Sequence, residues 1–246
     1  MQAPSPDVIA VSGFMAVVLA DYLRPHQAWG WMRLAQGTGA IKDLPGLRFA
    51  KVMGSGHGGG FSLRPSASHQ GLITVFEQRA QAEDFLTGPY VTAGRERSRE
   101  WWSAILAIDS ARGEWDGQVF TSTPHAANDS EIAGDAEPAL AVLTRASIRP
   151  AKAMAFWRFA PAAQADLQTA PGCILAMGLG EAPLVRQCTF SLWRDTPSML
   201  GYAHGGAHQT AIEAAYKHGF FSESLFMRMR VLHQQGQWKN HEASHG

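Results

Sequence analysis

The stretch LITVFEQRAQAEDFLTGPYV, residues 72–91, has the same layout as CTFSLWRDTPSMLGYAHGGA, residues 188–207. Each begins as an apolar strand, turns at a charged corner, continues as a helix and breaks near a glycine before a second helix. The two stretches occupy corresponding places in the two halves of the chain. This likeness indicates an internal duplication, in which each copy combines strands with helices.

The C-terminal half predicts six elements in the order strand, helix, strand, strand, helix, strand. Apolar alternation marks the strands, and a 3.6-residue period marks the helices. Asp195 and Pro197 give the last helical region a start signal, with Asp195 as N-cap and Pro197 in the first turn. The expected strands are 139–147, 173–179, 184–193 and 220–232, and the expected helices are 152–170 and 195–218.

The N-terminal half follows the same order, which is that of a ferredoxin-like unit. Its expected strands are 8–19, 47–53, 72–76 and 104–108, and its expected helices are 22–35 and 81–102. Two such units in one chain predict an α+β fold of two antiparallel sheets packed face to face, a dimeric α+β barrel with helices outside. A homodimer of the whole chain is a further option.

The predicted organisation has four segments. The first repeat covers 1–110, an irregular connector covers 111–137, the second repeat covers 138–232, and a polar tail covers 233–246. The connector is rich in Gly, Ser, Thr, Asp and Pro, but its aromatic and apolar side chains predict that its first part packs against the fold. These side chains are Trp115, Val119 and Phe120.

Composition excludes several classes of protein. Of the 246 residues, 17% are charged, and 21 Lys and Arg balance 21 Asp and Glu, so a nucleic-acid-binding protein is not expected. A hydrophobic content of 46% argues against a disordered chain. Cys173 and Cys188 form no C-x-x-C motif, which favours a reducing cytoplasm. The apolar stretch 8–19 is too short to span a bilayer.

The glycine-rich stretch GSGHGGGF, residues 54–61, has two interpretations. Its backbone can approach a ligand closely, or its N–H groups can hold an anion, which makes Gly58, Gly60 and the neighbouring His57 site candidates. It can also be a simple loop between two strands. Motifs of common hydrolases, NTPases and thiolate-heme enzymes are absent from the sequence.

Two histidines four residues apart, His204 and His208, flank Gly205 and Gly206. The glycines make one continuous helix improbable, so we expect a new helix to begin after them with His208 in its first turn and His204 outside it. A neutral imidazole on an apolar face suits an axial heme ligand, although a structural histidine is the commoner case. His26, His57, His69 and His125 are unranked pocket candidates.

The last strand and the strand before it add three candidates. Alternation places Glu223 and Arg228 on opposite faces of the last strand, either as polar groups of a pocket or as members of rim salt bridges. Trp193 ends the preceding strand, where it can line a site or close the core.

Four blocks together resemble the spheroidene monooxygenase family, the acyclic carotenoid 2-ketolases. The blocks are GSGHGGGF (54–61), GLGEAPLVRQCTFSLWRD (178–195), GAHQTAIEAA (206–215) and FFSESLFMRMRVL (220–232). The resemblance implies a heme b enzyme that uses O2 and electrons from a small carrier such as ferredoxin. It implies two hydroxylations at C-2 of an acyclic carotenoid, giving a diol that loses water to form a ketone. It also makes His208 the iron ligand.

The expected site therefore has three parts. His208 binds the heme iron; His204, Gly58, Gly60 and Trp193 contact the cofactor; and His57, Glu223 and Arg228 are catalytic. The chain departs from the family in the glycine motif, where His57 and Gly59 stand in place of a basic and an acidic residue, so a carotenoid substrate does not follow from the resemblance alone.

Two alternatives remain open at this stage. One is a heme enzyme of the same fold that dehydrates or N-oxygenates another small natural-product intermediate. The other is a non-catalytic protein that binds heme or lipid. The sequence shows no transmembrane segment, yet an apolar substrate dissolves in membranes. We therefore expect a cytoplasmic protein that docks transiently on membranes.

Overall fold

The computed structural model describes residues 9–60, 62–123, 139–182, 184–239 and 241–242. Its first repeat has four antiparallel strands in the spatial order β5-β2-β4-β3. Three α-helices and two short 3-10 helices connect them. The elements are β2 (Phe14–Tyr22), η1 (Arg24–His26), α1 (Gln27–Gln36), β3 (Leu47–Gly56), η2 (His57–Gly59), β4 (Pro65–Phe76), α2 (Arg79–Thr87), α3 (Pro89–Arg95) and β5 (Ser98–Trp115).

The second repeat has the same connectivity, with strands in the order β8-β9-β7-β10. Its elements are β7 (Leu140–Ile148), η4 (Pro150–Lys152), α4 (Ala153–Phe156), α5 (Ala160–Thr169), β8 (Cys173–Ala182), β9 (Arg186–Trp193), α6 (Thr196–Ala203), α7 (Gly206–His218) and β10 (Phe221–Trp238). Short strands β1 (Ile9–Val11), β6 (Gln118–Phe120) and β11 (His241–Glu242) extend the sheet. The two ferredoxin-like units confirm the expected fold.

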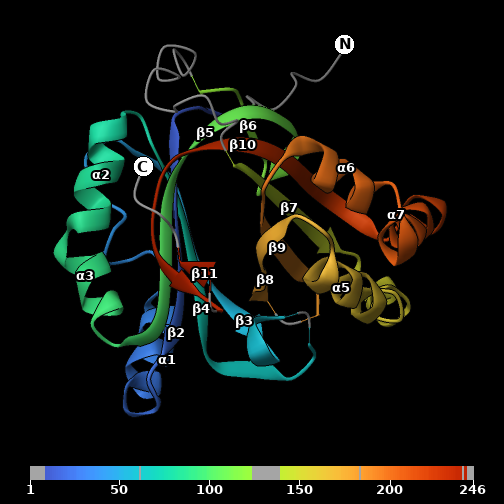
Figure 1. Cartoon of the computed structure of the whole chain (residues 1–246), viewed down its shortest axis with the longest axis horizontal. Helices are drawn as coiled ribbons and strands as arrows, with labels where there is room; N and C mark the ends of the chain where they lie inside the picture. The colour runs from blue at the N-terminus through green and yellow to red at the C-terminus, as the bar shows by residue number, and fades with distance from the viewer. Residues whose placement is uncertain (1–8, 61, 124–138, 183, 240, 243–246) are drawn as a thin grey trace, which may run out of the picture.

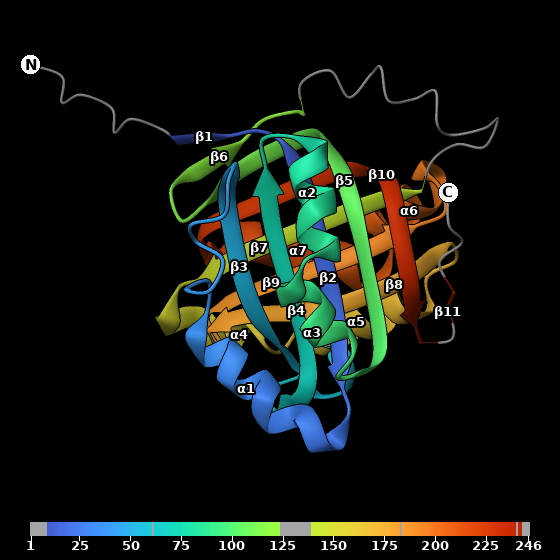
Figure 2. The same cartoon turned by 90° about the vertical axis from the view of Figure 1, so that its left-hand side faces the viewer.

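The two sheets close into one barrel of eight strands. β5 pairs with β10 along most of its length, and β3 meets β8 where Gly54 lies opposite Gly180. Figure 1 shows α1, α2 and α3 on one side of the barrel and α5, α6 and α7 on the other. In Figure 2 the strands of the second repeat cross behind those of the first. Among the described residues, no helix is long and apolar enough to span a membrane.

Strand alternation divides the apolar side chains between the barrel interior and the helix-covered faces. Met15, Val17 and Leu19 of β2 point inward and join a buried cluster to which all eight barrel strands contribute. Val18 and Tyr22 of the same strand point outward and pack beneath the helices of the first repeat. The barrel therefore has a filled interior, and each sheet has a second buried face under its helices.

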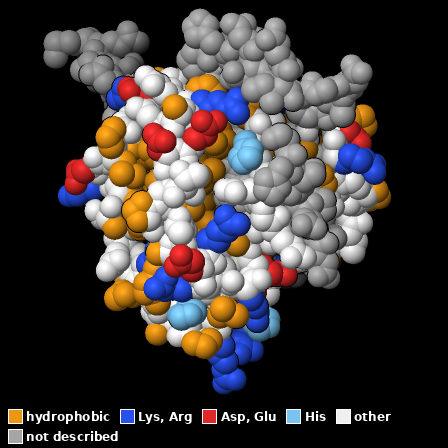
Figure 3. Space-filling model, turned by 60° about the vertical axis from the view of Figure 1, so that its left-hand side comes forward, with side chains coloured by type: hydrophobic (Ala, Val, Ile, Leu, Met, Phe, Trp, Pro, Cys, Tyr) orange, Lys and Arg blue, Asp and Glu red, His pale blue; other side chains and the backbone are white. Residues whose placement is uncertain are grey.

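The helix-covered side of the first repeat also exposes apolar side chains. Trp31 and Met32 of α1 keep 44% and 51% of their surface exposed. Figure 3 shows hydrophobic side chains between the charged ones on this side, including the lower end where α1 lies.

Several boundaries differ from those expected. The predicted helix 81–102 ends at Arg95, because Trp101 and Trp102 point to opposite faces of β5 and both are buried. The helix expected at 22–35 begins at Gln27, because β2 continues to Tyr22. Residues 95–100 before Trp101 are all polar or charged, so no hydrophobic period marks the change from helix to strand there.

The connector and the tail both begin inside long strands. β5 continues to Trp115, which is fully buried together with the nearly buried Phe120, as their apolar character predicts. β10 continues past residue 232, where a polar tail is expected, as far as the fully buried Trp238. Pairing with β5 supports this extension despite its polar composition. Most of the remaining connector, with His125, lies outside the described residues.

Candidate functional site

The helix break beside His208 is as the sequence predicts. The Asp195 side chain caps α6 by accepting a 2.7 Å hydrogen bond from the Ser198 N–H. His204 ends that helix, and α7 restarts at Gly206, whose φ of 57° favours glycine. His208 is consequently the third residue of α7, in its first turn.

Three rings lie in a row from the second sheet outward to His208. The Trp193 ring packs against Tyr202 at 5.4 Å between centroids, and Tyr202 stacks on His208 at 4.5 Å. Trp193 is 1% exposed, and its indole N–H donates to the Ser191 hydroxyl at 2.9 Å. We call Trp193, Tyr202 and His208 the aromatic row. It fixes the His208 ring from one side.

Hydrogen bonding and burial set the state of His208. The Tyr202 hydroxyl lies 3.1 Å from His208 Nδ1. Burial lowers the pKa of His208, against an opposing effect of the Asp166 carboxylate, so the imidazole is neutral at pH 7. In the tautomer whose Nδ1–H donates to Tyr202, Nε2 has a free lone pair and, among the described residues, no partner.

The glycine loop lies at a different place. His57 and Gly58 are exposed, whereas Gly59 and Gly60 are buried. A Cβ on Gly59 would lie 3.0 Å from Cδ2 of His69, so the loop covers His69 of β4. Lys239 Nζ donates to the Gly58 carbonyl at 3.2 Å. The loop therefore packs against His69 of the first repeat, whereas the aromatic row belongs to the second.

His69 belongs to a polar cluster for which the sequence gives only a weak signal. Its Nδ1 lies 2.8 Å from the Ser66 hydroxyl, and its Nε2 lies 3.5 Å from Asp21 Oδ2, which also accepts from Arg99 Nε at 2.5 Å. The Trp238 ring meets His69 edge to face at 5.9 Å. The available signal is Asp21, a carboxylate at the end of an otherwise apolar strand.

Ser66 has a structural role in this cluster. Its hydroxyl oxygen accepts from the backbone N–H groups of Ser68 and His69, at 3.3 Å and 3.1 Å. It can therefore donate its proton to His69 while it holds the turn. These bonds explain the Ser66–His69 contact without assigning Ser66 as a nucleophile.

Glu223 lies in a partly exposed ionic cluster around the buried Arg145. The Arg145 side chain is fully buried and contacts Glu223, Glu181 at 3.2 Å and Asp116 at 3.4 Å. Lys51 contacts Glu181 at 3.1 Å. With Arg186, which contacts Asp116 at 3.3 Å, three cations face three carboxylates. This balance favours the salt-bridge interpretation of Glu223.

Arg228 points to the face of β10 opposite Glu223, as alternation predicts. It is partly buried, and within the described part of the chain its buried Nε has no hydrogen-bond partner. The structure thus brings Trp193 and His208 together through Tyr202. The structure places His57, Gly58 and Gly60 near His69. Glu223 lies in the ionic cluster, and Arg228 lies on the outer face of the sheet. The exposed His204 lies at the helix break.

A metal ion held by several side chains is one kind of site to test in this structure. Among the described residues, no group of three or more His, Cys, Asp or Glu side chains could hold a metal ion. A heme needs one axial side chain from the protein, so the test of fit rests on His208 alone. A neutral, oriented imidazole with one available nitrogen fits that requirement.

No family model matches the chain. Two solved structures of aldoxime dehydratases share its fold at 10% and 11% identity, with TM-scores of 0.57 and 0.54. The first, in complex with butyraldoxime, matches 89% of this chain and 79% of its own; the second matches 94% and 88%.

Named relatives are much closer in sequence. A spheroidene monooxygenase of Rubrivivax gelatinosus is 43% identical over 95% of this chain and 88% of its own length. That of Rhodobacter capsulatus is 36% identical over 80% and 81%. This identity extends over nearly the whole chain, and the chain therefore belongs to the spheroidene monooxygenase family.

Proposed function

We propose that this chain is a heme-dependent monooxygenase that oxidises an acyclic carotenoid at C-2, first to an alcohol and then to a ketone. It uses O2 and electrons from a small redox protein such as ferredoxin. Family membership supports the monooxygenase activity and the carotenoid class. The observation that supports heme is His208, half-buried in the aromatic row, with Nδ1 beside a hydroxyl and Nε2 without a described partner.

The residues of the aromatic row have separate tasks in this proposal. His208 supplies the axial nitrogen, and Tyr202 holds its ring and its tautomer through Nδ1, as partners of metal-bound histidines commonly do. Trp193 fixes Tyr202 from the sheet side and keeps water from it. Heme bound at His208 would supply the O2 activation that hydroxylation of a C–H bond requires.

The surface near His208 suits a water-insoluble substrate. Leu200 of α6 and Ile212 and Tyr216 of α7 are exposed by 41%, 38% and 83%. An apolar surface of this kind allows a carotenoid to transfer from a membrane during transient docking. The cytoplasmic location and the catalytic roles of His57, Glu223 and Arg228 stay predictions.

An absorption spectrum tests the heme proposal. Protein purified from heme-supplemented cells is expected to show a Soret band and to bind CO when reduced, and His208→Ala is expected to lose both. His204→Ala is the matched control, because His204 is exposed and lies four residues away. Equal Soret bands in wild type and His208→Ala, with native circular dichroism in both, would contradict the assignment of His208.

Turnover separates the proposal from its alternatives. With spheroidene, O2 and reduced ferredoxin, we expect the C-2 ketone as product. A Soret band without carotenoid product, but with dehydration or N-oxygenation of another intermediate, would favour the alternative of a heme enzyme with the same fold and a different substrate. Heme with both axial positions filled and no turnover would favour a carrier. Absence of a Soret band would reject both heme enzymes.

A further inference from the structure

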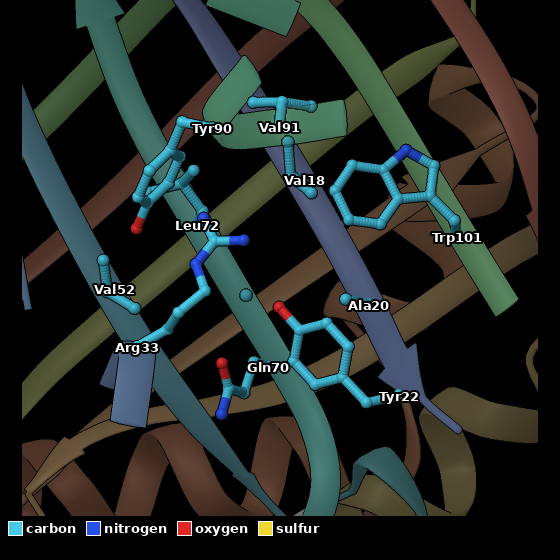
Figure 4. Close-up of a pocket in the computed structure, with 11 residues that line it drawn as sticks. Val18, Ala20, Tyr22, Arg33, Val52, Gln70, Leu72, Tyr90, Val91 and Trp101 are labelled. Carbon is cyan, nitrogen blue, oxygen red and sulfur yellow. The ribbon is translucent and has the colours of Figure 1, made fainter. Parts of the chain in front are cut away.

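A small cavity lies on the outer face of the first repeat, between the sheet and helices α1 and α3 (Figure 4). Its volume is about 20 Å³, which is room for one water-sized guest. Apolar side chains from the strands form much of its wall. The polar groups at its edge come from Tyr22, Arg33, Gln70, Tyr90 and Trp101.

Arg33 is a buried cation without a neutralising partner. It is 9% exposed, and among the described residues no carboxylate pairs with it and no acceptor receives a hydrogen bond from it. Its guanidinium lies 3.7 Å from the Tyr90 ring centroid and 4.7 Å from that of Trp29. The two rings attract the cation, but they cannot neutralise its charge.

Tyr22 adds a second donor to the same space. Figure 4 shows its hydroxyl and one nitrogen of Arg33 pointing toward the middle of the cavity. Burial raises the pKa of Tyr22 although Arg33 acts to lower it, so the hydroxyl keeps its proton and cannot serve as counter-ion to Arg33. Within the described residues, this hydroxyl has no protein acceptor.

Glycines let the helices close over these donors. A Cβ on Gly30 of α1 would lie 2.6 Å from the Tyr22 ring, and one on Gly94 of α3 would lie 2.8 Å from an Arg33 nitrogen. Any side chain at either position would have to displace a cavity-lining group. The close approach of both helices therefore encloses the cation and the hydroxyl in one space.

We propose that this cavity binds a small monovalent anion between the Arg33 guanidinium and the Tyr22 hydroxyl. One cation favours one negative charge, and the volume limits the guest to a halide or to one oxygen of a carboxylate group. Both sources present the same chemistry to the site. This binding is independent of the heme proposal, because the cavity lies in the other repeat.

Chloride and acetate are the two probes for this site. Chloride binding is followed by NMR line width and acetate binding by calorimetry, both at constant ionic strength. We expect saturable binding of at least one of them in the wild type, and its loss in Arg33→Gln. Arg97→Gln is the matched control, because Arg97 also lies over the Trp29 ring, at 4.9 Å, but pairs with Glu96 at 3.7 Å.

Tyr22→Phe keeps the ring and removes only the second donor. It is expected to weaken binding about tenfold, as for one hydrogen bond to a charged group. Chloride competing with acetate would support one shared site, and binding of only one probe would identify the anion type. Absence of saturable binding in the wild type, or equal binding in Arg33→Gln and Arg97→Gln, would overturn the proposal.

Discussion

The helix-covered faces of the two sheets occupy equivalent places in the two repeats, and each buries a nitrogen-bearing side chain against a tyrosine ring. In the first repeat, the Arg33 guanidinium lies over Tyr90, the second residue of α3. In the second, Tyr202 stacks on His208, the third residue of α7. One nitrogen group is a permanent cation, and the other is a neutral imidazole.

This difference shows which properties the duplicated fold determines and which it leaves to individual residues. Strand order and helix placement create a second buried face in both repeats. The charge buried there depends on one or two side chains. A permanent cation favours an anion as its partner, whereas a neutral imidazole favours a metal or a hydrogen-bond donor. One architecture can thus present two kinds of binding chemistry.

The largest expected difference between the faces comes from removing a tryptophan. Trp193→Ala should lower the free energy of unfolding by about 3–5 kcal/mol, because it removes a fully packed ring. Trp101→Ala should cost less, because Trp101 borders a cavity and its N–H has no partner among the described residues. Urea unfolding of both variants measures the difference. An equal or larger cost for Trp101→Ala would contradict this view of the first face.

Arg33→Met tests whether the cation of the first face is uncompensated. In buffer without small anions, we expect a gain of about 1 kcal/mol in the free energy of unfolding, because an unpaired buried charge is replaced by an apolar chain. Arg97→Met, which removes the other guanidinium over the Trp29 ring, should change the free energy of unfolding by less than about 0.5 kcal/mol. If chloride binds as proposed, adding it should reduce the gain. A clear loss of stability in anion-free buffer would mean that Arg33 has a stabilising role.

The fold was largely predictable because its signals are local. The strand and helix periods, the N-cap at Asp195 and the glycine break before His208 all appear within short windows of sequence. The ends of β5 and β10 were not predictable in this way. Trp101 and Trp238 each follow a polar stretch of sequence, and both are placed by pairing between strands that are distant in sequence.

The site was less predictable, because alternation shows on which face of a strand a residue lies but not which residues of other strands it contacts. The row from Trp193 to His208 depends on Tyr202, which the sequence does not single out. Glu223 proved to face Arg145 of another strand. The isolation of Arg33 is likewise a property of helices α1 and α3 and the sheet together, since no window of sequence shows a missing counter-ion.

The tyrosine hydroxyls of the two faces should differ in a smaller way. Tyr202→Phe keeps the ring but removes the contact with His208 Nδ1, so we expect the free energy of unfolding to fall by about 1 kcal/mol. Tyr90→Phe should cost less than about 0.5 kcal/mol, because the described residues offer its hydroxyl no hydrogen bond. Chemical denaturation of the two variants compares them. Equal costs would show that the His208 contact adds no stability.

The smallest expected effect concerns pH and the buried imidazole of the first repeat, His69. Burial lowers its pKa most; the charges of Lys239, Arg99 and His57 lower it further, and Asp21 opposes them. At pH values well above 6.5 this imidazole is neutral in both folded and unfolded chains and gives no pH dependence. As the pH falls through about 6.5, the unfolded chain takes up the proton first, so stability decreases toward the folded pKa.

We expect NMR titration to place the pKa of His69 below that of histidine in an unstructured peptide. We also expect His69→Gln to reduce the loss of stability between about pH 6.5 and 5. Arg33→Met should leave this pH dependence unchanged, because it removes no group that titrates between about pH 5 and 7. A His69 pKa above the peptide value would mean that Asp21 outweighs burial, and the first repeat would then bury two cations rather than one.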